Sequence, residues 1–147
     1  MDPRVEKLKT PAECEIFAKN TAERKRPDLA AEARRKAVDM QASTHEAASP
    51  LEAEAFAAVY AYEALLTRKR GKKTRASGTW QAIKRHGIVE AVQRALSYPP
   101  EATDRETLHE MGLADFTFEA LVLRHEASFS EEAVQLSKAR LAEPAQH

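Results

Sequence analysis

The chain has 147 residues, of which 43% are apolar and 31% charged, and its 23 basic side chains balance 23 acidic ones. This size suits one ordinary domain, 1–147, with enough apolar residues for a core. No apolar run approaches the roughly 20 residues of a membrane span, and the first residues lack the apolar segment of a secretory signal. The single cysteine, Cys14, excludes an intramolecular disulfide and an all-cysteine metal site. We expect a cytoplasmic protein without membrane contact, metal or cofactor.

The composition favours an all-α fold. Glycine occurs only four times, aromatic residues make up 6% of the chain, and no convincing run of alternating polarity is present. We predict a compact domain of about seven or eight helices. It would comprise an N-terminal αα-hairpin and a helical core that contains a helix-Gly-helix unit at 76–97. The same pattern allows a subdivision into the hairpin, 10–43, and the core, 50–142.

The first helices are predicted from their start signals. Thr10 and Pro11 form a cap followed by a proline in the first turn, and Glu13 completes a capping box. These residues predict a helix at about 11–24. A second proline breaks this helix and starts another at about 27–43. The side chains expected to face inward from the second helix are Leu29, Ala30, Ala33, Ala37, Val38 and Met40.

The most apolar segment follows Ser49 and Pro50, which repeat the cap-and-proline signal. Its apolar stripe is wide, so a helix at about 50–68 should be central to the fold. Two shorter helices are predicted at about 76–85, with Gly87 as the C-cap, and at about 88–97. A third should start at Thr103 or Asp104 as its cap and end at Gly112, and a fourth should follow Asp115 as its cap. The last is predicted at about 130–142, starting at Ser130.

The stretch from Arg68 to Gly87 has eight basic residues and no acid. The rest of the chain therefore has 23 − 8 = 15 basic against 23 acidic residues. Such a concentration of charge indicates a polyanionic partner, first of all nucleic acid. The alternative is the solvated basic face of an ordinary helical domain. Cations at the end of a helix also complement its dipole, which explains two or three of the eight charges.

Double-stranded DNA is the preferred partner, with phosphates bound by the basic loop and the start of the helix at 76–85, including its free backbone amides. Gln81, Lys84 and Arg85 would then reach base edges. The full set of candidate nucleic-acid-binding residues is Arg68, Lys69, Arg70, Lys72, Lys73, Arg75, Ser77, Thr79, Gln81, Lys84 and Arg85.

The unit at 76–97 is helix-turn-helix-like, but only in part. With Gly87 as the turn glycine, the position at which that motif buries a branched residue falls on Gln93. The second helix has Glu90 and, as its only cation, Arg94. We therefore expect the first helix, rather than the second, to contact DNA.

Trp80, the only tryptophan, has two interpretations. It could stack on a base, as in proteins that bind single strands. Its helical spacing from Ala76 and Ile83 instead favours a place in the core.

No catalytic residues are assigned. Three His-Glu pairs begin at His45, His109 and His125, but none reaches a second histidine at the spacing of a zinc protease. We expect them to be exposed polar residues, and Cys14 to be buried rather than a nucleophile.

Three functional classes follow. The first is a nucleic-acid-binding regulator or accessory subunit that acts through residues 68–86. The second is a non-enzymatic adapter that binds a protein partner through its acidic surface and N-terminal hairpin. The third is a hydrolase that uses His125 and Glu119.

Overall fold

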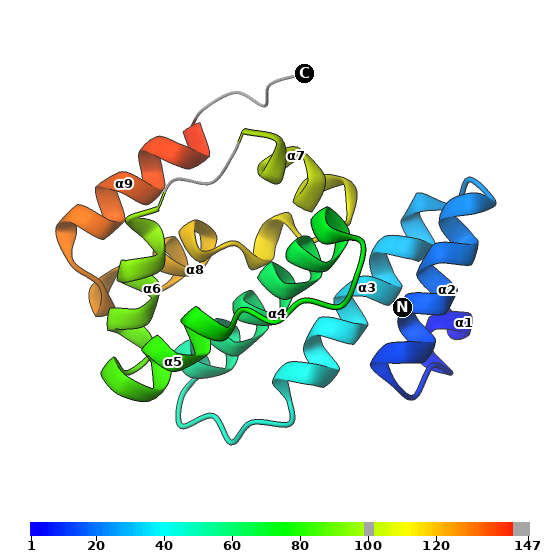
Figure 1. The fold of residues 1–147 in the computed structure, drawn as a ribbon, viewed down its shortest axis with the longest axis horizontal. Coiled ribbons are helices and arrows are strands. Elements are labelled where there is room, and N and C mark those ends of the chain that lie inside the picture. Colours follow the sequence, from blue (N-terminus) through cyan, green and yellow to red (C-terminus); the bar gives the residue numbers. More distant parts are fainter. Residues whose placement is uncertain (99–101, 143–147) are drawn as a thin grey trace.

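The computed structural model describes residues 1–98 and 102–142. Within these residues all regular structure is helical and no strand occurs, which confirms the all-α prediction (Figure 1). None of the described helices is both long and apolar enough to cross a bilayer. The α-helices are α1 (Pro3–Glu6), α2 (Pro11–Glu23), α3 (Pro27–Ala42), α4 (Pro50–Arg70), α5 (Ser77–His86), α6 (Ile88–Leu96), α7 (Ala102–Glu110), α8 (Phe118–Arg124) and α9 (Glu131–Ala142), with 3-10 turns η1 (Ala114–Phe116) and η2 (Glu126–Ser128).

Helices α2 and α3 form the predicted hairpin, at one end of the molecule in Figure 1. Thr10 and Glu13 make both hydrogen bonds of the capping box, as expected. The two helices enclose a small core of their own, built largely from alanine. The buried residues of that core are Cys14, Ala18, Ala30 and Ala33. Burial raises the pKa of the Cys14 thiol, as is usual for a cysteine that packs as a small apolar residue.

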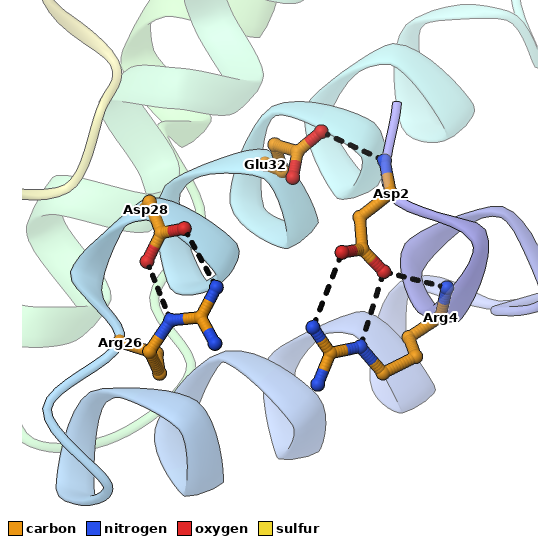
Figure 2. Close-up of polar contacts among 5 residues, drawn as sticks. All are labelled: Asp2, Arg4, Arg26, Asp28 and Glu32. Atoms are coloured by element: carbon orange, nitrogen blue, oxygen red, sulfur yellow. Dashed lines mark hydrogen bonds and ion pairs between the residues drawn. The ribbon is translucent and has the colours of Figure 1, made fainter.

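The short helix α1, which the sequence reasoning missed, is held to α3 by polar contacts. The backbone amide of Asp2 donates to Glu32 at 3.1 Å, while the carboxylate of Asp2 pairs with Arg4 at 3.1 Å (Figure 2). The ammonium of Lys36 donates to the last two carbonyls of α1, at 2.9 and 2.8 Å. These bonds satisfy carbonyls that the end of a helix leaves without partners.

The helix at 50–70 is central, as predicted, since α3, α6, α7 and α8 all contact it. Two larger cores lie along α4. One joins Ala55 to buried residues of α6, α8 and α9. The other places Val38 of α3 against Ala57 and Ala61, together with Met111 and Leu113 that follow α7. Through α3 the hairpin is therefore attached to the central helix.

Two of the predicted helix starts are wrong. The seventh helix begins at Ala102, so Thr103 and Asp104 lie inside it rather than at its cap. The cap of α8 is Thr117, whose hydroxyl accepts a hydrogen bond from the third residue of that helix. Asp115 instead pairs with Arg35 of α3 at 3.5 Å. A contact between distant segments thus decides which of two nearby polar residues becomes the cap.

Candidate nucleic-acid interface

The basic stretch folds back over the central helix. Gly71, with φ of 72°, ends α4 in the left-handed conformation that glycine accepts without strain. The chain then crosses in front of α4 and enters α5 (Figure 1). The hydroxyl of Thr67 accepts a hydrogen bond from the amide of Thr74 at 3.0 Å, which fixes the loop against the end of α4.

One carboxylate, Glu63 of α4, holds the start of α5. It accepts hydrogen bonds from the amide of Ala76 at 3.0 Å and from the indole nitrogen of Trp80 at 2.6 Å. Arg75 approaches the same oxygen at 3.9 Å. The amide of Ala76 is thus already engaged by the chain itself. Sequence reasoning missed Glu63, although an acid within the most apolar helix was a signal that a partner must be provided.

Trp80 belongs to an aromatic cluster and is half-buried, so its ring packs against the protein, as its helical spacing predicted, but outside the fully buried core. Its ring stacks on His45 at 5.2 Å between centroids and meets Tyr60 at 5.1 Å. His45 also stacks on Phe56 at 4.4 Å, Phe56 and Trp80 lie 6.2 Å apart, and the ring nitrogen of His45 hydrogen-bonds the hydroxyl of Tyr60 at 2.8 Å. The expectation that His45 is simply exposed is wrong, because the residue is half-buried and its ring packs against aromatic side chains.

The structure leaves nearly all the candidate binding residues at the surface. Thr79 is the exception, since it is half-buried and lines a cavity. On α5 the exposed side chains lie on one face, opposite the face of Trp80 and Ile83. The exposed candidates are Arg68, Lys69, Arg70, Lys72, Lys73, Arg75, Ser77, Gln81, Lys84 and Arg85.

Two of the eight cations have acidic partners. Lys69 pairs with the nearly buried Asp104 of α7 at 3.0 Å, and Arg75 lies 3.9 Å from Glu63. The side chains of the other six make no ion pair or hydrogen bond with any residue in the described ranges. We call these six residues the basic surface: Arg68, Arg70, Lys72, Lys73, Lys84 and Arg85.

The second helix of the helix-Gly-helix unit is packed into the core. Gly87 alone joins α5 to α6, at φ of 83°, whereas a helix-turn-helix has a turn of three or four residues. Val92 and Leu96 are buried against α8 and α9, and the side chain of Gln93 accepts a hydrogen bond from the amide of Ser130 at 2.9 Å. This side of α6 is not available to a DNA groove, while the exposed face of α5 is.

A cavity of about 390 Å³ lies among α4 to α9. Aromatic rings line it, and two ion pairs sit at its wall: Lys69 with Asp104, and Arg140 with Glu119 at 3.7 Å. Both carboxylates are thus already matched by cations of the chain.

The residues of the hydrolase hypothesis are not brought together. Glu119 pairs with Arg140, whereas His125 makes a very short contact with Glu54 of α4, which also accepts a bond from Arg124 at 2.6 Å. Burial alone would raise the pKa of Glu54, but hydrogen bonds from His125 and Arg124 outweigh it and leave that pKa below its ordinary value. These contacts join α8 to α4 and leave no acid–base pair between His125 and Glu119.

No group of three or more metal-ligating side chains gathers within residues 1–98 and 102–142. Comparisons with protein-family models, with curated proteins and with solved structures find no match to the chain.

Proposed function

We propose that this protein binds nucleic acid, double-stranded DNA by preference, through the basic surface, and that it acts as a regulator or as an accessory subunit in the cytoplasm. The observation that supports this most strongly is the exposure of six cations without an acidic partner among the described residues. Elsewhere the chain pairs many of its cations, for example Arg26 with Asp28 and Arg94 with Glu90. Unneutralised cations at a surface attract a polyanion and release its counterions.

The local structure is suited to this role because it is fixed before a ligand arrives. The hydrogen bonds of Glu63 and the stacking of Trp80 hold α5 with Gln81, Lys84 and Arg85 facing outward. A helix of this length presents about 15 Å of surface, enough to lie along a major groove. Lys72 and Lys73 precede this helix and would contact the phosphate backbone.

A salt titration of duplex binding, followed by fluorescence anisotropy, tests the proposal. If all six cations contact phosphates, the log–log slope of affinity against salt should be about −5. The double variant Lys84→Ala with Arg85→Ala should bind more weakly, reduce the slope by about 2, and melt at the parent temperature. Absence of binding at low salt, or a flat salt dependence, would exclude the function.

A matched control is available on and directly after α2. Lys19 and Arg24 are exposed cations without an acidic partner in the described ranges, at the hairpin end of the molecule. Replacing both by alanine changes the net charge by the same amount as the α5 double variant. If this control weakens duplex binding equally, the attraction is general and does not localise to the basic surface.

A further inference from the structure

Arg34, in the middle of α3, is a buried arginine. Only 8% of it is exposed. It lies one helical turn before Val38, which packs against Ala57 and Ala61 of α4. It also lies one turn after the fully buried Ala30. Ala30 belongs to the core between α2 and α3, so Arg34 lies on the inward side of α3, beside the seam with α4 where Val38 packs.

A second arginine faces this seam from the other helix. On α4 the residues that pack toward α3 are Ala57, Ala61 and Ala64, spaced by four and three residues. The next position of that stripe, four residues further, is Arg68. Because α3 and α4 run in opposite directions side by side, the start of α3 lies toward the end of α4 (Figure 1). Arg34 and Arg68 thus belong to facing stripes at the same end of the seam.

The charge of Arg34 is not compensated within the described residues. Its Nε is fully covered and has no hydrogen-bond partner. Burial lowers the pKa of Arg34, and the nearby charge of Arg68 lowers it further, against an opposing influence of Glu15. No ion pair with Glu15 forms. A guanidinium nevertheless stays protonated in proteins, so a buried positive charge remains.

Buried charges in proteins are normally paired, because an unpaired ion in a low-dielectric site is costly. The chain follows this rule at its other well-buried arginine: Arg140, whose side chain is 12% exposed, pairs with Glu119 and donates to the carbonyl of Leu96. Arg34 departs from this rule, because it has no acidic partner within hydrogen-bonding distance among the described residues. A buried polar group without a partner in the chain is a candidate for contact with a water or an ion from outside.

We propose that Arg34 and Arg68 together bind a phosphate group at the end of the α3–α4 seam. Guanidinium groups suit this ligand because their planar forks of N–H donors match tetrahedral oxyanions. The small side chains of Ala61 and Ala64 keep the seam narrow, so the site fits a small oxyanion better than a bulky acid. The phosphate comes either from a free phosphate ion or from nucleic acid, since Arg68 also begins the basic surface. In the second case the site rests on the proposed function.

Thermal unfolding in inorganic phosphate tests the site, with sodium chloride at equal ionic strength as the reference. At about ten times the dissociation constant, phosphate should raise the melting temperature of the parent by about 3–6 °C. It should do the same for Arg24→Gln, which changes an exposed arginine at the end of α2 and serves as the control. Arg68→Gln and Arg34→Met should lose this shift, and their phosphate affinity by calorimetry should be about tenfold to a hundredfold lower.

The two variants fail in different ways, which keeps the test decisive. Arg34→Met removes an uncompensated charge and keeps most of the aliphatic length, so without phosphate it should melt at or above the parent temperature. If Arg34→Met does not fold, Arg68→Gln still tests the site, because Arg68 is exposed and its replacement should leave the fold intact.

Duplex binding then identifies the source of the phosphate. The site is assigned to nucleic acid if two results are found. Arg34→Met and Arg68→Gln must lose more duplex affinity than Arg24→Gln, and inorganic phosphate must compete with the duplex for the parent protein. If the duplex does not bind at all but phosphate still stabilises the protein through both arginines, the proposed function fails and the phosphate site stands. If neither phosphate nor duplex distinguishes these variants from Arg24→Gln, the site does not exist.

Discussion

Trp80→Ala should destabilise the protein because it removes the contact between α5 and the central helix. The indole stacks on His45, meets Tyr60, and donates to Glu63 at 2.6 Å. A hydrogen bond to a charged acceptor contributes about 1.5–3 kcal/mol, and an aromatic pair adds about 0.5–1.5 kcal/mol. Replacing a fully buried tryptophan by alanine costs about 3–5 kcal/mol. Since Trp80 is half-buried, we expect about 3 kcal/mol.

The variant Trp80→Phe separates the ring from its polar group. It keeps an aromatic surface against His45 but has no N–H for Glu63. We expect a loss of about 1.5–2 kcal/mol, because Glu63 retains the amide of Ala76 and stays partly satisfied.

Urea unfolding followed by far-ultraviolet circular dichroism gives the measurement. Tryptophan fluorescence is unsuitable, because Trp80 is the only tryptophan and its removal abolishes the signal. The expected order of stability is parent, Trp80→Phe, Trp80→Ala. If Trp80→Ala unfolds within about 0.5 kcal/mol of the parent while single-strand binding falls by about 1–3 kcal/mol, then Trp80 is a stacking platform and its assignment to the core is refuted.

Three further outcomes are expected. Gly112→Ala should lower the free energy of unfolding by about 2–4 kcal/mol, because φ is +75° and a Cβ there would lie 2.4 Å from that of Ala31. Gly71→Ala should cost only about 1–2 kcal/mol, because φ is +72° but no atom lies within 4 Å of the added Cβ. Equal losses for the two variants in chemical denaturation would contradict this reasoning. Glu54→Gln should lower the free energy of unfolding by no more than about 1 kcal/mol at neutral pH, because the carboxylate is partly exposed. The pKa of Glu54 is lowered because the folded protein favours its ionised form, so this difference should fade as the pH drops from 4.5 through the pKa of the folded state. Deleting residues 1–46 should collapse the fold, because α3 covers part of α4; an unchanged melt together with loss of a protein partner would favour the adapter function instead.

The helices were predictable where their start signals are local. Thr10 with Pro11, and Ser49 with Pro50, each place a hydroxyl cap and a proline within two residues, and the structure begins α2 and α4 at those prolines. The end of α4 at Gly71 is equally local, because only the left-handed conformation is needed there. Such signals depend on the backbone hydrogen bonds of one turn and do not require knowledge of the packing.

Predictions failed where two local signals competed. Asp115 and Thr117 are both good caps, and the sequence does not say that Asp115 has a partner on α3.

The inward stripe of α3 was predicted from its apolar members only. Arg34 falls on the same stripe, between Ala30 and Val38, and this spacing was the available signal for a buried cation.

Glu63 and Arg34 are two charged residues whose surroundings depend on how distant segments pack, which sequence spacing does not reveal. Both are charged residues on helices that pack in the core, and both would be costly if left unpaired. The partners of Glu63 lie 13 and 17 residues away, where the chain folds back over α4, so the fold itself satisfies this acid. Arg34 faces the end of the same helix, where the residue provided is a second cation. The first arrangement fixes the position of α5 without a ligand. The second leaves a positive charge without an acidic partner among the described residues, which is why we propose a phosphate site at Arg34 and none at Glu63.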